Sequence, residues 1–219
     1  PIFLTKKGSN WRLDDEKLVY PFYEKAAKGG VPILCIHKGL MPADYEQSCP
    51  GLWQHATVCD LGKAAKHWPQ ITFVIYHSAL RPYVELPEQS LAQFESTGRI
   101  DWVTDLAEIP AKHGVQNVYA ELGTCFANTC VTHPKLAAAL MGTLIKGLGE
   151  DRVIWGTDSV WWGSPQWQIE AMRRLEIPED MQKKYGYRPL GAADGPVKTK
   201  IFAGNASKLY KIDPAAAAK

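Results

Sequence analysis

Three side chains that can bind a metal ion or move a proton follow short apolar runs in this sequence: His37, His77 and Asp158. Glu121 ends a fourth run of the same kind. Imidazole nitrogens and carboxylate oxygens are the usual ligands of a catalytic zinc ion, and a zinc site with an open position can activate water. These residue types therefore predict a metal-dependent catalytic site, provided that the four runs lie side by side.

Each of these residues also has a structural interpretation. A lone histidine after an apolar strand is more often a hydrogen-bonded residue of the core or rim than a ligand. Asp158 suits a turn or a helix N-cap before Ser159. Because the same kind of residue recurs at the same place in each run, a joint site is the better interpretation.

The four runs are rich in β-branched and aromatic residues, as is typical of strands buried on both faces of a parallel sheet. They begin about 40 residues apart, which leaves room for a loop, a helix and a return to the next strand. The pattern therefore predicts successive βα units, and in a βα barrel the residues at the carboxyl ends of the strands converge on one mouth. The runs comprise residues 31–36, 71–76, 118–120 and 153–157.

Residues that typically start and end helices lie between the runs, which supports this interpretation. Acidic residues 14–16 predict a helix that ends at Gly29 and that Pro21 either opens or kinks. The tail from Pro196 is expected to form two short helices broken at Gly204 and Asn205. The other expected helices comprise residues 54–67, 100–113, 134–147 and a segment that begins at Ser164.

The composition is that of an ordinary globular protein. The 219 residues include 25 Lys and Arg against 23 Asp and Glu, a net charge of +2, and 46% are hydrophobic. No run approaches the ~20 apolar residues of a membrane span, and no basic block suggests nucleic acid, so we expect a small molecule as partner. Five cysteines do not suggest a disulfide framework, and Cys35 is expected in the core.

Several motifs resemble the later strands of the amidohydrolase-related family of metal-dependent TIM-barrel hydrolases and decarboxylases. The closing segment Ile201 to Leu209 also resembles that family's C-terminal helix entry. The resemblance covers nearly the whole chain. It implies an α/β chain, residues 1–219 as a single domain, that forms about strands five to eight of a (β/α)₈ barrel. The strand motifs are CIHKG from Cys35, IYHSA from Ile75 and WGTDS from Trp155.

The resemblance implies a role for each matching residue. His37 falls at a metal ligand, and His77 falls at a residue that is either a ligand or a catalytic acid/base. Asp158 falls at an aspartate that touches the metal and can carry a proton. The implied cofactor is a divalent metal ion, most simply zinc. Glu121 has no firm counterpart, and either a substrate contact or a structural hydrogen bond fits it.

One part of the family pattern is missing. The first strand of the family carries a His-x-His or Glu-x-His pair, and neither pair occurs here. We therefore expect that the chain is the C-terminal part of a longer barrel, that it needs the N-terminal half, and that alone it is poorly active. The alternative is a degenerate, non-catalytic barrel. The sequence leaves open whether the chain forms a homodimer. The lack of a signal-peptide pattern favours the cytoplasm over the periplasm.

Further residues near the strand ends are candidates for substrate binding. Lys38 and Arg81 follow the two histidines and could pair with a substrate carboxylate. Trp161 lies near Asp158 and could line a pocket for a planar substrate, as Glu121 could. The predicted function is hydrolysis of ester, lactone or amide bonds in a small carboxylated or cyclic substrate. Non-oxidative decarboxylation of an aromatic or muconate-type acid is the alternative on the same residues.

Overall fold

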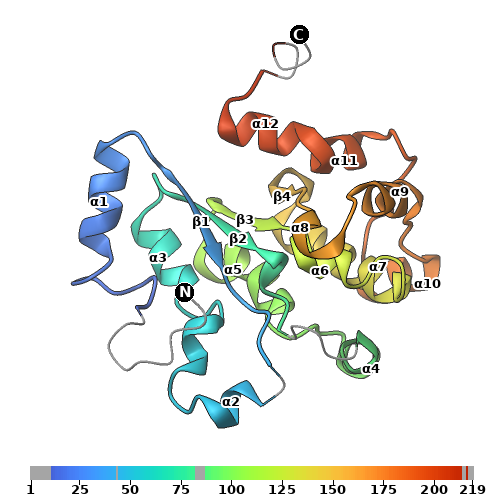
Figure 1. Cartoon of the computed structure of the whole chain (residues 1–219), viewed down its shortest axis with the longest axis horizontal. Coiled ribbons are helices and arrows are strands. Elements are labelled where there is room, and N and C mark those ends of the chain that lie inside the picture. Colours follow the sequence, from blue (N-terminus) through green and yellow to red (C-terminus); the bar gives the residue numbers. More distant parts are fainter. Residues whose placement is uncertain (1–10, 43, 82–86, 214–215, 217–219) are drawn as a thin grey trace.

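The computed structural model describes residues 11–42, 44–81, 87–213 and 216, and its centre is a parallel sheet (Figure 1). The sheet has the order β1-β2-β3-β4, so each strand pairs with its neighbour in the sequence. The expected succession of parallel βα units is thereby confirmed. The strands are β1 (Ile33–His37), β2 (Thr72–Tyr76), β3 (Val118–Glu121) and β4 (Val153–Ile154).

The register of the sheet places the strand ends together. His37 is opposite Tyr76 in the β1–β2 pair, and Glu121 is opposite Ile154 in the β3–β4 pair. β4 is shorter than the sequence predicted, because the backbone N–H of Trp155 donates to the carbonyl of Ile201 at 3.0 Å. The chain beyond Ile154 therefore leaves the sheet before it reaches Asp158.

Helices and short turns connect the strands. Most are short, and α5 and α7, which pack against each other, are among the longer ones. The helices are α1 (Tyr20–Lys28), α2 (Tyr45–Ser48), α3 (Leu61–His67), α4 (Pro87–Thr97), α5 (Val103–His113), α6 (Gly123–Ala127), α7 (Pro134–Leu148), α8 (Ser159–Trp162), α9 (Gln166–Arg174), α10 (Glu179–Tyr185), α11 (Pro196–Thr199) and α12 (Asn205–Tyr210). The 3₁₀ turns are η1 (Trp53–Ala56), η2 (His77–Ala79) and η3 (Glu150–Arg152), and η4 (Lys200–Gly204) is a π-helix.

Most of the expected helices are present. Pro21 lies in the first turn of α1, so it opens that helix and does not kink it. The expected helix at 54–67 is split into η1 and α3. The expected break in the tail is wrong, since Gly204 has helical φ and ψ of −58° and −44° and η4 continues into α12. Asn205 is a buried anchor there, and its amide donates to the carbonyls of Glu150 and Val153.

Val74 of β2 points to one face of the sheet and is fully buried there. The main hydrophobic core lies on the other face, to which Phe73 and Ile75 point. α3, α5 and α7 pack against one another in chain order on this side. β1 is an edge strand, and the Cys35 side chain on it is exposed, so the expectation that Cys35 is a core residue is wrong. In Figure 1, α11 and α12 lie along one side of the sheet, and the hydroxyl of Tyr210 in α12 lies 3.6 Å from Sγ of Cys35 on β1.

All five cysteines are free thiols, as their odd number suggested. Among the helices placed within residues 11–213, none is long and apolar enough to cross a membrane.

Candidate active site

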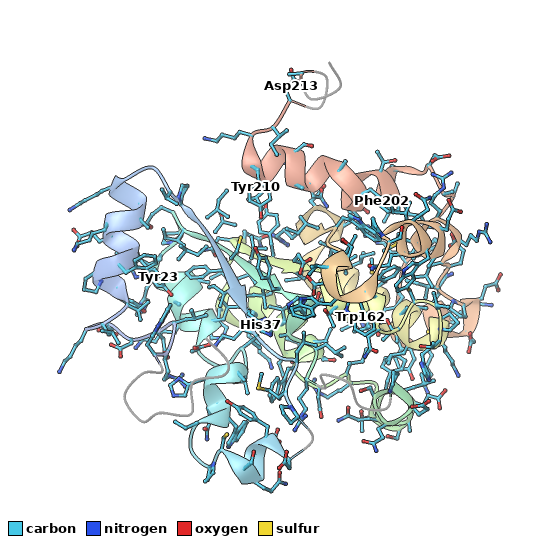
Figure 2. All side chains as sticks on the ribbon, viewed as in Figure 1. Tyr23, His37, Trp162, Phe202, Tyr210 and Asp213 are labelled. Carbon is cyan, nitrogen blue, oxygen red and sulfur yellow. The ribbon has the colours of Figure 1, made fainter. Side chains whose placement is uncertain are left out.

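The carboxyl ends of the four strands bring the candidate residues together, as Figure 2 shows for His37 and the nearby Trp162. The ring centroids of His37 and His77 lie 4.6 Å apart, with the rings steeply inclined at 68°. Nδ1 of His77 lies 3.0 Å from Oδ2 of Asp158 and 3.9 Å from Oε2 of Glu121. The structure therefore places residues from all four strand ends at one site.

His37 presents an uncharged imidazole at the site. Its Nε2 is buried and has no hydrogen-bond partner among the residues that the structure places. Burial, reinforced by the neighbouring His77, lowers the pKa of His37 to about 4, although a hydrogen bond to the Gly39 backbone opposes the change. At neutral pH His37 is uncharged, which is the form in which imidazole binds metal ions.

An unusual turn aims His77 at the site. His77, Ser78 and Ala79 have φ values of 58°, 50° and 58°, all in the left-handed region that non-glycine residues rarely adopt. Such strain costs about 1–3 kcal/mol a residue and persists only where the surroundings hold it. Here the Glu121 carboxylate accepts the backbone N–H of His77 at 3.0 Å, and the Ser78 hydroxyl donates to the Glu121 carbonyl at 2.9 Å.

Glu121 is a buried carboxyl group that holds this turn. Burial raises its pKa, and the backbone N–H of His77 works against that increase. A Cβ at Gly156 would lie 1.4 Å from Glu121 Oε1, and one at Gly123 would lie 2.7 Å from His77 Nδ1. The two glycines therefore leave the space that Glu121 and His77 occupy. Glu121 makes the structural hydrogen bond that was one of its two expected roles.

Asp158 is held by a residue that the sequence did not single out. Its Oδ2 accepts hydrogen bonds from the backbone N–H and the hydroxyl of Thr124, at 3.0 and 2.5 Å. Burial would raise the pKa of Asp158, but the hydrogen bonds from His77 and Thr124 outweigh it and lower the pKa to about 2. Asp158 is therefore an ionised carboxylate. The one sequence signal for Thr124 is its place just after the end of β3.

The charged residues that follow the two histidines in the sequence form ion pairs with other carboxylates. Nζ of Lys38 lies 3.0 Å from both carboxylate oxygens of Asp60 and 2.7 Å from the carbonyl of His55. Arg81 pairs with Glu46 through two nitrogens. These contacts give both cations structural partners, so we do not carry them into the proposed substrate site.

Trp161 and Trp162 differ in their position relative to the site. The Trp161 side chain is 78% exposed. The indole N–H of Trp162 donates to the Thr124 hydroxyl at 3.0 Å. The aromatic side chain that reaches the Asp158 cluster is therefore Trp162, one residue later in the chain than the expected Trp161.

Replacing Lys38 with Ala is expected to lower the free energy of unfolding by about 3–5 kcal/mol, because it leaves a buried carboxylate without its partner. Both partners are deeply buried, with side-chain exposures of 3% for Lys38 and 0% for Asp60. The double variant Lys38→Met with Asp60→Leu should recover part of that loss, because it removes both buried charges but also the acceptor of the Leu13 backbone N–H. Urea denaturation of the three proteins checks this, and an unchanged midpoint for Lys38→Ala would refute the structural role.

The site residues do not form a ready-made ligand set. Over the part of the chain that the structure describes, no three His, Cys, Asp or Glu side chains are grouped as ligands of one metal ion. His77 instead turns Nδ1 towards Asp158. The unpartnered Nε2 of His37 and the ionised Asp158 nevertheless have the chemistry of metal donors. The residues present fit a divalent metal ion, with two donors to offer.

Comparison with known proteins identifies the family. The amidohydrolase family model matches residues 3–212. The chain belongs to the amidohydrolase family. Curated proteins give no match.

Three solved structures with a similar fold illustrate the relationship. A 5-carboxyvanillate decarboxylase from Novosphingobium aromaticivorans, complexed with manganese and 4-hydroxy-3-methoxy-5-nitrobenzoic acid, is 16% identical (TM-score 0.52, covering 94% of this chain and 55% of its own). A TIM-barrel protein from Bordetella bronchiseptica is 16% identical, with a TM-score of 0.52, and the match covers 92% of this chain and 53% of that protein. An amidohydrolase from Burkholderia multivorans with bound zinc is 14% identical, with a TM-score of 0.50, and the match covers 93% of this chain and 63% of that protein.

These likenesses establish the fold. The parallel sheet and its helices are similar to those of amidohydrolase TIM-barrel proteins. The chain spans between 53% and 63% of the length of the three structures above. As an amidohydrolase family member it is a relative of metal-containing proteins, two of which hold manganese and zinc respectively.

Proposed function

We propose that this chain carries the acid/base half of a metal-dependent active site that removes carbon dioxide from a carboxylated aromatic ring. The observation that carries the proposal is the pair formed by His77 Nδ1 and Asp158 Oδ2 at 3.0 Å, beside the neutral, unpartnered His37. An imidazole oriented by a carboxylate is a proton donor and acceptor at its other nitrogen. The decarboxylase named among the similar structures supports the choice of substrate class.

His37 and Asp158 would hold the divalent metal ion, zinc or manganese. His37 offers Nε2, and Asp158 offers its carboxylate. When bound, the ion supplies positive charge that stabilises an anionic substrate. Because the chain contains neither a His-x-His nor a Glu-x-His pair, we expect it to bind the ion weakly by itself. We place its strands at the fifth to eighth positions of the barrel.

His77 would carry the proton of the reaction. It takes a proton at Nε2 and gives it to the ring carbon that bears the carboxylate. The bond to the carboxylate then breaks, its electron pair returns to the ring, and carbon dioxide leaves. Asp158 stabilises the charged imidazole by accepting the hydrogen bond of Nδ1, and Glu121 holds the backbone of His77 in place.

Hydrolysis of an ester, lactone or amide bond in a small carboxylated or cyclic substrate is the second candidate, because the family includes hydrolases by name. In that reaction a base removes a proton from the attacking water. Oδ2 of Asp158 already accepts hydrogen bonds from Thr124 and His77, so His77 is the better base here. This observation moves the proton-accepting role from Asp158, where the sequence placed it, to His77.

One experiment separates the two reactions. The protein, supplied with excess Mn²⁺ or Zn²⁺, is incubated in D₂O with a panel of hydroxybenzoates and, separately, with esters, lactones and amides. Decarboxylation predicts release of carbon dioxide and one deuterium on the ring carbon that lost it. Hydrolysis without carbon dioxide release would show that the protein is a hydrolase and not a decarboxylase. Turnover that a chelator leaves unchanged would show that the reaction does not need a metal ion.

A further inference from the structure

We propose that Thr124, with Trp162, is a positioning residue that holds Asp158 against His77 and so fixes which nitrogen of His77 carries the proton. This inference goes beyond the proposed function, on which it rests only in taking His77 as the proton-transfer group. Thr124 is 4% exposed and is the second residue of α6, the short helix that follows β3. Its contacts reach Asp158, His77 and Trp162.

The hydrogen bonds have only one direction that satisfies every group. The indole N–H of Trp162 is a donor only, so the Thr124 hydroxyl oxygen must accept it at 3.0 Å. The single hydroxyl proton of Thr124 then points to Asp158 Oδ2 at 2.5 Å. The backbone N–H of Thr124 adds a second donor to the same oxygen at 3.0 Å.

The acceptor oxygen Oδ2 of Asp158 decides which nitrogen of His77 carries the proton. Oδ2 of Asp158 is an acceptor without a proton of its own, and it lies 3.0 Å from His77 Nδ1. Two lone pairs facing each other at that distance repel, so Nδ1 must carry the proton. The backbone N–H of Thr124 also lies 3.2 Å from Nδ1, and this contact would favour the opposite tautomer if Asp158 turned away. Thr124 thus decides between the two tautomers through Asp158.

Asp158 needs such support because the sheet does not hold it. β4 ends at Ile154, and Asp158 lies in the connection to α8 with φ at 47°. Its side chain is 28% exposed, which leaves it space to rotate. On the other side, the carbonyl of Trp162 accepts the indole N–H of Trp167 at 3.2 Å, so the chain of hydrogen bonds runs back into α9.

The tautomer matters because only one form is useful. With the proton on Nδ1, Nε2 has the lone pair that can take up and return a proton at the substrate. With the proton on Nε2, the imidazole presents a weak donor and no base, and triads with the wrong tautomer lose most of their activity. Thr124 touches no substrate in this account, so it is a positioning residue and not a catalytic one.

The test reads the tautomer directly, without metal or substrate. The 219-residue protein is labelled with ¹⁵N-histidine, and ring nitrogens are correlated with ring protons at pH ~9, above the ordinary imidazole range. His77→Gln identifies the His77 signals by their disappearance. We expect the Nδ1–H form to outnumber the other about tenfold or more in the unsubstituted protein.

Two matched variants then isolate the hydroxyl. Thr124→Val keeps the shape and the backbone N–H but removes the hydroxyl, and its ratio of tautomers should fall severalfold. Thr124→Ser should restore the original ratio. Trp162→Phe, which keeps Thr124 but frees its hydroxyl to turn, should shift the ratio in the same direction by less.

The outcomes are decisive. An unchanged ratio in folded Thr124→Val, or in Trp162→Phe should the valine variant not fold, overturns the inference. A ratio that Thr124→Ser fails to restore also overturns it, because bulk and not the hydroxyl would then be responsible. Since the readout needs no turnover, failure of the proposed decarboxylation would leave this result intact, and the reverse holds as well.

Discussion

Replacing His77 with Gln is expected to lower turnover by about 10²- to 10⁴-fold, the usual loss of a general acid or base. Glutamine has a comparable volume but cannot take up and return a proton. Metal affinity should stay close to that of the unsubstituted protein, because His37 and Asp158 remain. The measurement is kcat beside a metal titration, with Mn²⁺ or Zn²⁺ in excess for the assays.

The chain offers a matched control for that substitution. His133 pairs with Glu88 on the surface at 2.9 Å, so His133→Gln makes the same chemical change away from the site. It should leave turnover within about twofold. Should His77→Gln lose metal as fully as a variant of His37, then His77 is itself a ligand and the site holds two metal ions.

Replacing His37 with Ala is expected to weaken metal binding by more than about 100-fold, a loss above the 10- to 100-fold that follows removal of a group merely supporting a ligand. Activity should fall with metal content and recover in part when excess metal is added, because the proton-transfer pair of His77 and Asp158 is untouched. Isothermal titration with Zn²⁺ and Mn²⁺ gives the affinities, and assays at rising metal concentration give the recovery. Full activity at low metal in this variant would show that His37 is not a ligand.

The strand ends were predictable because the signal is local. Each strand is an apolar run that stops at one ionisable residue, and parallel strands carry such residues to one edge of the sheet. The end of β4 was not predictable in the same way. It depends on the hydrogen bond between Trp155 and Ile201, which are far apart in the sequence. The continuous tail helix likewise depends on the anchoring of Asn205 to Glu150 before β4 and to Val153, the first residue of β4.

The substrate-binding expectations show the limit of arguing from neighbours in sequence. Successive side chains of an extended chain point to opposite faces, so Lys38 beside His37 is directed to Asp60 and not into the site. Trp161 and Trp162 differ by about 100° around a helix, and the latter reaches Thr124. The place of Thr124 just after β3 is too weak a signal to single it out, because its role arises only when Asp158 is placed beside it.

The most direct measurement is anomalous diffraction from crystals of the protein soaked in millimolar Mn²⁺ or Zn²⁺, a concentration that fills even a weak site. We expect a peak within bonding distance of His37 Nε2 and the Asp158 carboxylate, with His77 still hydrogen-bonded to Asp158. No peak at His37, or a peak only at a surface pair such as His133 and Glu88, would contradict the account of this strand end as a metal-dependent active site.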